Sequence, residues 1–85
     1  MKQFTYVIKD ELGIHARPAG LLVKEAKKFA SDIKIATAAK EANAKGVMGV
    51  MGLGAKHGEE ITITATGEDE EAAIQALQEF VETNL

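Results

Sequence analysis

The hexapeptide from Gly13 to Pro18 fixes the point at which this chain must change from strand to helix. The residues just before it, 4–9, alternate between apolar and polar side chains, as a half-buried strand does. Pro18 is the only proline, and it stands where the first turn of the following helix is expected. Its missing N–H costs nothing in that turn, and its fixed φ is already helical. The chain is therefore predicted to pass from strand to helix at His15.

The residues at this junction suit the binding of an anion. His15 lies just ahead of the predicted helix, where the free N–H groups of the first turn and the positive end of the helix dipole favour negative charge. The backbone N–H groups of Ala16 and Arg17 would hold phosphoryl oxygens, whereas Pro18 offers none. The Arg17 side chain adds a forked set of donors that matches phosphate or carboxylate. This arrangement predicts a histidine that takes up a phosphoryl group; a solvated loop histidine without a special task is the alternative.

Hydrophobic periodicity predicts the other elements of the chain. Residues 10–13 form a turn, a helix is expected over 16–29, strands over 33–37, 41–44 and 61–66, and a last helix from the acidic residues at 68–71 to about 83. A hairpin turn at 38–40 joins the two middle strands. The side chains predicted to face the core are Phe4, Tyr6, Ile8, Ala19, Leu22, Val23, Ala26, Phe29, Ile33, Ile35, Ile61, Ile63, Ala65, Ala73, Ile74, Leu77, Phe80 and Val81.

The order of these elements indicates the fold class. Alternating strands with one polar face are typical of an antiparallel sheet that is covered by helices on one side only. The predicted class is therefore α+β. A chain of 85 residues is long enough for one hydrophobic core and too short for a Rossmann or barrel enzyme, so residues 1–85 are expected to form a single domain.

Composition argues against several kinds of function. The net charge of −3 gives no electrostatic support for a nucleic-acid partner. The chain has no cysteine, and His15 and His57 are too few for a structural zinc site, so we expect neither a metal nor another cofactor. His57 lies in a loop and is expected to be solvated and inert. No apolar run is long enough to span a membrane, and the residues after Met1 lead into a strand pattern without a signal core, so the expected location is the cytoplasm.

The glycine-rich residues 43–54 form the second informative segment. They lack the Gly-Lys-Ser/Thr ending of a phosphate-binding loop. As a short helix they would carry interior glycines that each cost up to about 1 kcal/mol relative to alanine. The apolar residues of so short an element cannot all face one core; they are Val47, Met48, Val50, Met51 and Leu53. Either they fill the edge of the sheet, or some of them, above all Met48 and Met51, stay exposed as a docking surface, for which adaptable methionines are well suited.

The segment Gly13-Ile14-His15-Ala16-Arg17-Pro18-Ala19 resembles the active-site signature of HPr, the histidine-containing phosphocarrier family of the bacterial phosphoenolpyruvate-dependent sugar phosphotransferase system. The likeness extends over nearly the whole chain, in its length, the position of the histidine, the order of elements and the short helix near residue 50. It implies an open-faced β-sandwich of order βαββαβα, in which three helices cover one face of a four-stranded antiparallel sheet.

For function, the resemblance implies a stoichiometric phosphoryl carrier and not an enzyme. His15, with Arg17 beside it, would accept the phosphoryl group at Nδ1 from enzyme I and pass it to sugar-specific enzyme IIA domains; a monomer is expected. We expect the neutral ring to be the nucleophile, because the helix start and Arg17 both disfavour imidazolium. In the family, the short helix and the start of the first helix form the patch that meets both partners. The matching residues here are Gly20, Val47, Met48 and Met51.

Three positions depart from the family pattern. Many members from low-GC Gram-positive bacteria carry, just before the short helix, a serine that a dedicated kinase phosphorylates; Gly46 occupies that position here and has no hydroxyl to modify. Leu12 replaces a small polar residue before the site, so one side-chain hydrogen bond near the phosphate is absent. Gly20 lowers helix propensity by up to roughly 1 kcal/mol against alanine. It either softens the helix start or lets a neighbouring backbone pack close.

Other functions stay open at this level. A carrier with the same chemistry would also suit a regulatory branch, such as nitrogen-related phosphotransfer, in place of sugar uptake. An interaction module with the HPr fold would bind a partner without carrying phosphate, although the intact signature at 15–18 argues against it. A nucleic-acid-binding domain that uses its sheet face ranks far lower, because the charge is negative and aromatic residues are few. The sequence does not distinguish which sugars or IIA partners lie downstream.

Overall fold

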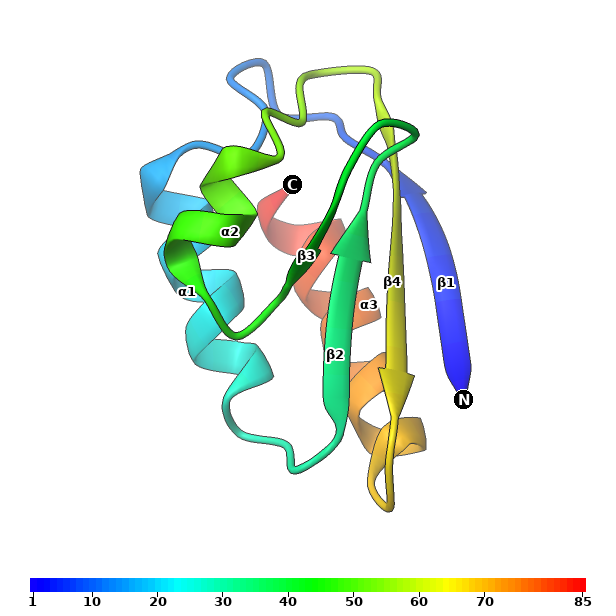
Figure 1. The fold of residues 1–85 in the computed structure, drawn as a ribbon. Coiled ribbons are helices and arrows are strands. Elements are labelled where there is room, and N and C mark those ends of the chain that lie inside the picture. Colours follow the sequence, from blue (N-terminus) through cyan, green and yellow to red (C-terminus); the bar gives the residue numbers. More distant parts are fainter.

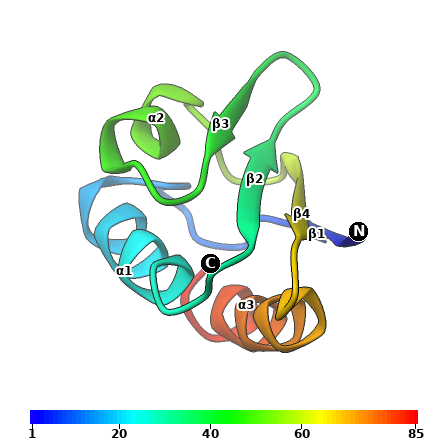
Figure 2. The same cartoon turned by 60° about the horizontal axis from the view of Figure 1, so that its bottom comes forward.

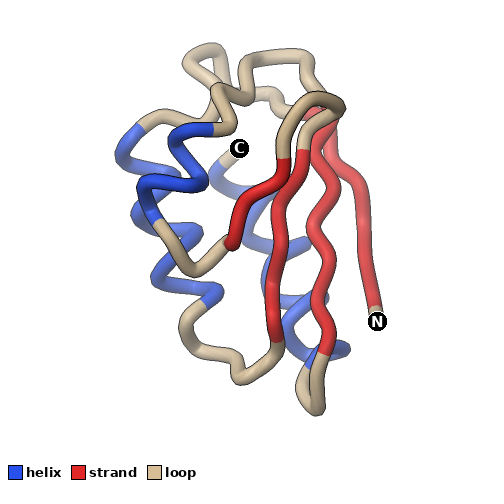
Figure 3. Tube along the Cα trace, viewed as in Figure 1, coloured by secondary structure: helices blue, strands red, loops and turns tan.

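The computed structural model describes residues 1–85 and contains four strands and three helices in the predicted order (Figure 1). The elements are β1 (Lys2–Val7), α1 (Ala16–Ala26), β2 (Asp32–Ala36), β3 (Glu41–Asn43), α2 (Val47–Gly52), β4 (Glu60–Thr66) and α3 (Glu70–Asn84). The strands form one antiparallel sheet of order β1-β4-β2-β3. Figure 3 shows the helices together on one side of this sheet. The predicted α+β open-faced sandwich is thereby confirmed.

The helical layer brings segments together that are far apart in the sequence. α1 and α3 contact each other, and α3 also contacts β1 and β4. α2 contacts α1 and β3, so it extends the layer beyond the other two helices (Figure 2). The start of the first helix and the short helix therefore belong to the same side of the molecule.

β4 lies in the middle of the sheet and shows the predicted alternation most clearly. It pairs with β1 on one side, where Phe4 lies opposite Ile63, and with β2 on the other, where Ile35 lies opposite the same residue. Along β4, fully buried residues alternate with residues that reach solvent; the buried ones are Ile61, Ile63 and Ala65. Alternate side chains of this strand thus point to the face of the sheet that the helices cover.

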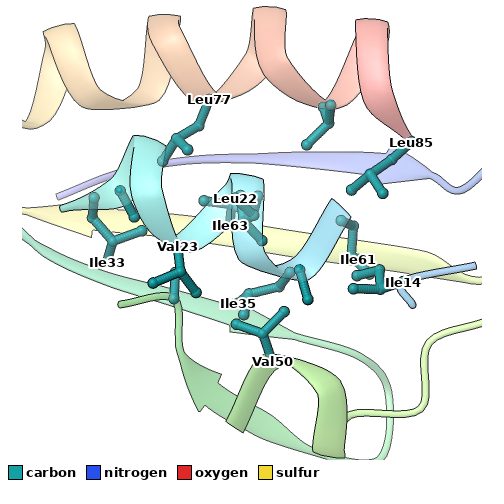
Figure 4. Close-up of a cluster of buried hydrophobic side chains, with 14 of the residues drawn as sticks. Ile14, Leu22, Val23, Ile33, Ile35, Val50, Ile61, Ile63, Leu77 and Leu85 are labelled. Atoms are coloured by element: carbon teal, nitrogen blue, oxygen red, sulfur yellow. The ribbon is translucent and has the colours of Figure 1, made fainter. Parts of the chain in front are cut away.

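A single hydrophobic core of 19 buried residues fills the space between the sheet and the helices. Figure 4 shows side chains from all three helices in this cluster: Leu22 from α1, Val50 from α2 and Leu77 from α3 gather near sheet residues such as Ile63. Burial of one such side chain contributes about 1.5–3 kcal/mol. Every residue that the sequence predicts to face the core is buried or packs against it.

The two long helices differ from the prediction at their ends. α1 ends at Ala26 and not at residue 29, because the N–H of Phe29 donates to the carbonyl of Ala26 (3.2 Å), three residues back, and this tighter turn closes the helix. Phe29 is half-buried and still packs on the core. α3 begins at Glu70 and not at 68, because the backbone of Asp69 before it is not helical (φ −105°, ψ 24°).

Candidate functional site

His15 is the N-cap residue of α1, and its backbone is extended (φ −97°, ψ −176°). Its carbonyl accepts a helical hydrogen bond from the N–H of Ala19 (3.0 Å). The N–H groups of Ala16 and Arg17 donate to no backbone carbonyl, so the start of α1 presents free donors beside the imidazole. The side chain of His15 is 38% exposed. The structure therefore places an accessible imidazole at a helix start that favours an anion.

The loop before His15 is held by the loop between α2 and β4. Gly13 has a φ of +68°, and its N–H closes a turn onto the carbonyl of Asp10 (3.0 Å). Ile14 donates its N–H to the carbonyl of Ala55 (3.0 Å) and buries its side chain in the core. The imidazole is thus carried by backbone that is fixed on one side by this loop and on the other by α1.

His15 opens onto a shallow pocket of about 240 Å³. The pocket is lined by Asp10, His15, Arg17, Pro18, Leu21, Thr83 and Asn84. The end of α3 forms part of the wall and also holds the loop, since the carbonyl oxygen of Leu85 accepts hydrogen bonds from the N–H groups of Lys9 (2.6 Å) and Asp10 (2.8 Å). The pocket is smaller than the roughly 300–1,000 Å³ of sites for drug-sized ligands, so a small group fits it better.

Charged side chains of opposite sign line this pocket. Arg17 takes part in no ion pair within the chain, which leaves its guanidinium free for an anion. The Oδ2 atom of Asp10 lies 3.9 Å from Nε2 of His15. Sequence periodicity marks residues 10–13 only as a turn, and it does not reveal Asp10, Thr83 or Asn84 as neighbours of the histidine. The pocket thus joins residues predicted from the local motif with residues that only the tertiary fold brings to it.

Comparison with known proteins decides which family this site belongs to. Residues 2–83 match the family model PTS-HPr, described as the PTS HPr component phosphorylation site. The chain belongs to the HPr family. The phosphocarrier protein HPr of Mycoplasma genitalium is 48% identical over 85 residues, which cover 99% of this chain and 97% of the relative.

Solved HPr structures have the same fold as this chain. A mycoplasma histidine-containing phosphocarrier protein is similar with a TM-score of 0.94 and 46% identity, covering 99% of this chain and 97% of that one. HPr of Thermoanaerobacter tengcongensis is similar with a TM-score of 0.93 and 45% identity, covering 99% and 94%. This HPr is therefore a phosphocarrier protein of the phosphotransferase system, and its family membership implies partners within that system.

In this HPr, the apolar residues of α2 divide between the core and the surface. Val50 is buried, whereas Met48 is 83% exposed. Met51 and Val47 also reach solvent, at 40% and 38%. Of the two interpretations of the glycine-rich segment, the structure agrees with the one in which some large apolar residues stay exposed. Leu21 of α1, which falls outside the predicted core stripe, is exposed as well.

The two glycines that differ from the expected pattern have room for a side chain. Gly46 is the N-cap of α2, and a Cβ built there would meet only the carbonyl oxygen of Asn43, at 3.7 Å. A serine side chain would therefore fit at position 46, so the backbone geometry does not explain why glycine stands there. A Cβ built at Gly20 would meet nothing within 4 Å. The interpretation that a neighbouring backbone packs close to Gly20 is therefore wrong.

Gly20→Ala is expected to raise the free energy of unfolding by about 0.5–1 kcal/mol, because alanine restricts the unfolded chain and meets no obstacle in α1. Urea denaturation measures the gain. Gly54→Ala serves as the control, since its φ of +64° strains an alanine and the variant is expected to lose stability. A loss of stability in Gly20→Ala would mean that glycine is structurally required at this position.

Three observations concern other kinds of site. None of the helices combines the length and the apolar character that crossing a membrane needs. No three side chains of His, Cys, Asp or Glu lie close enough together to hold a metal ion. His57 is exposed in the loop between α2 and β4, and it does not line the pocket of His15.

Proposed function

We propose that this HPr accepts a phosphoryl group from phospho-enzyme I at Nδ1 of His15 and passes it to sugar-specific enzyme IIA domains. The observation that supports this most directly is the position of His15 at the N-cap of α1, next to the free N–H groups of Ala16 and Arg17. An anion is stabilised at such a helix start by these donors and by the helix dipole. The unpaired guanidinium of Arg17 adds a positive charge in the same pocket.

In the transfer, the lone pair of Nδ1 attacks the phosphorus in line with the leaving nitrogen of the phosphohistidine on enzyme I. The new N–P bond forms as the old one breaks. Each imidazole keeps the proton on its other ring nitrogen, so only the PO3 group moves. The negative charge on the phosphoryl oxygens is stabilised by the N–H groups of Ala16 and Arg17 and by the guanidinium. The IIA domain supplies the nucleophile for the second transfer.

A carrier must bind its phosphoryl group loosely enough to give it up. The exposed His15 ring and the single arginine of the pocket suit this need better than a buried site with several arginines. The protein therefore acts as a stoichiometric carrier and not as an enzyme. The carrier is proposed to act as a monomer.

Partner recognition is assigned to Val47, Met48 and Met51, which we call the α2 surface, together with Gly20 on α1. Exposed methionines adapt to partners of different shape, as a protein that meets both enzyme I and IIA domains requires. Gly46 provides no hydroxyl, so regulation by serine phosphorylation at this position is absent. The relay begins with phosphoenolpyruvate, which cells make in the cytoplasm, and the carrier is assigned to the same compartment.

The test is incubation with phosphoenolpyruvate and enzyme I, followed by measurement of the intact mass. Wild type and the control His57→Ala are expected to gain one acid-labile phosphate, and His15→Ala is expected to gain none. A 31P NMR spectrum of the product identifies the phosphorylated nitrogen. Phosphate on His15→Ala would contradict the proposal. So would a folded wild type that takes none from an active enzyme I, a result that favours a regulatory branch or an interaction module.

A further inference from the structure

Asp10 provides the only carboxylate within 4 Å of a ring nitrogen of His15. Its Oδ2 atom lies 3.9 Å from Nε2 of the imidazole, and both side chains line the same pocket. The transfer step proposed above engages Nδ1. The contact at Nε2 therefore concerns the opposite side of the ring, where no other charged group of the chain pairs with it.

The loop holds the carboxylate of Asp10 in a defined orientation. The N–H of Asp10 donates to the carbonyl of Leu85 (2.8 Å), and its carbonyl accepts from the N–H of Gly13 (3.0 Å). In its side chain, Oδ1 accepts the N–H of Leu12 (2.8 Å), which forms an Asx turn. Because Oδ1 is engaged within the loop, Oδ2 is the oxygen that remains to face His15. The backbone thus orients the carboxylate, so the contact is more than an encounter of two mobile side chains.

We propose that Asp10 is a positioning residue that sets which nitrogen of His15 accepts the phosphoryl group, an inference that rests on the proposed carrier function. An ionised carboxylate only accepts hydrogen bonds, so it favours the tautomer with the proton on Nε2, the nitrogen that it faces. In that tautomer Nδ1 carries the lone pair. The separation of 3.9 Å exceeds a hydrogen bond, and a small rotation of the exposed ring or one bridging water spans it.

The same carboxylate disfavours a phosphoryl group on Nε2. Phosphorylation there would bring anionic oxygens next to Oδ2 of Asp10, and like charges at this distance repel each other. By contrast, the free N–H groups of Ala16 and Arg17 favour the oxygens of a phosphoryl group on Nδ1. The tautomer and the repulsion thus act in the same direction, and both favour Nδ1.

Asp10 also shapes the loop, so the experiment has to separate this structural role from positioning. Asp10→Asn keeps an oxygen that accepts the N–H of Leu12 while an amide replaces the charged Oδ2. Asp10→Ser, whose hydroxyl also accepts that N–H, is a second uncharged variant. Glu11→Gln is the matched control, because it removes the same charge from the adjacent exposed residue. The amide signal of Leu12 and the thermal midpoint report whether the loop is intact.

Two NMR measurements test the positioning role of Asp10 without enzyme I. 15N NMR of the unphosphorylated proteins, at a pH where the ring is neutral, gives the tautomer of His15. We expect Nε2–H in wild type and in Glu11→Gln, and a shift towards Nδ1–H in Asp10→Asn. Phosphoramidate, a small donor that needs no docking, then loads the ring. In the 31P spectrum we expect the Nδ1 product from wild type and an added Nε2 product from Asp10→Asn.

With phospho-enzyme I as the donor, the initial rate for Asp10→Asn is expected to fall about tenfold, by analogy with the lower end of the effects of removing a carboxylate that orients a metal-bound histidine. Asp10→Asn and Asp10→Ser with the wild-type tautomer and the wild-type product ratio would overturn the inference, even if their thermal midpoints fall. A wild type that takes no phosphate from phospho-enzyme I would instead overturn the carrier proposal. The tautomer and the phosphoramidate product would then still decide the role of Asp10.

Discussion

Gly13→Ala is expected to lower the free energy of unfolding by about 2–5 kcal/mol, of which the left-handed φ contributes about 1–2 and overpacking about 1–3. Gly13 has a φ of +68°, a conformation that an alanine adopts only at a cost. A Cβ built there lies 2.7 Å from Cα of Lys56 and closer still to the carbonyl oxygen of Ala55. Both atoms belong to the backbone, so a whole loop must move. The same carbonyl accepts the N–H of Ile14, and the shift therefore breaks a bond that holds the residue before His15.

Urea denaturation of this variant is best compared with that of Gly54→Ala. Gly54 has a φ of +64°, but no atom lies within 4 Å of its built Cβ. The control is expected to lose only the conformational part, about 1–2 kcal/mol. The difference between the two variants isolates the close approach of the two loops, and equal losses would rule that approach out as the cause. We also expect Gly13→Ala to accept phosphate more slowly, because the displaced loop carries the imidazole.

Side-chain periodicity predicts most of the fold because it records which face of an element packs on the core. In residues 61–66, the alternate positions held by isoleucine and alanine are the ones that the structure buries. The predicted helix is too long at residues 27–29, because its end is placed from the spacing of apolar residues. Phe29 continues the helical spacing and does pack on the core, but the backbone leaves the helix at Ala26. The spacing of apolar residues identifies the packed face and does not fix where the helical hydrogen bonds end.

The candidate site is predictable where its chemistry is local in the sequence. His15 and Arg17 stand together at a strand-to-helix junction, so their relation to the helix start follows from the motif. Thr83 and Asn84 reach the pocket only because the end of α3 packs against the loop, and no local pattern encodes so distant a contact. Asp10 has an acidic neighbour in the next position, and only the hydrogen bonds of the folded turn show that it is Asp10 whose carboxylate faces the histidine.

The start of α3 contains another contact that the sequence does not predict. Asp69 is the N-cap of α3, yet its side chain does not cap that helix. Its Oδ1 accepts hydrogen bonds from the N–H (3.0 Å) and the hydroxyl of Ser31, and its Oδ2 accepts one from the N–H of Ala30 (2.8 Å). Gly67 permits this approach, since a Cβ there would stand 2.6 Å from Oγ of Ser31. Asp69 thus joins the α1–β2 and β4–α3 loops, at the end of the sheet opposite the loop that precedes α1 (Figure 1).

Asp69→Asn is expected to lower the thermal midpoint by about 5–10 °C at neutral pH, because its amide would face the N–H of Ala30 donor to donor. The hydrogen bond from the Ser31 hydroxyl, and then that from Ala30, hold the pKa of Asp69 below its ordinary value. The ionised carboxylate therefore stabilises the fold above the unfolded-state pKa of about 4, and this contribution is lost as the pH falls through the lower folded-state pKa. The difference in thermal midpoint between wild type and Asp69→Asn is therefore expected to be widest above the unfolded-state pKa and to close on acidification.

Thermal unfolding followed by circular dichroism between about pH 2 and pH 7 measures this gap. Glu68→Gln is the matched control, because it removes the same charge from an exposed neighbour, and it is expected to follow wild type. Ser31→Ala removes only the hydroxyl and is expected to give a smaller fall. The pKa of Glu70 is lowered too, first by a hydrogen bond from the N-terminal ammonium group, but Glu70 is present in every variant and cancels in the comparison. A gap that stays constant from neutral to acidic pH would show that the charge of Asp69 does not stabilise the contact between the two loops.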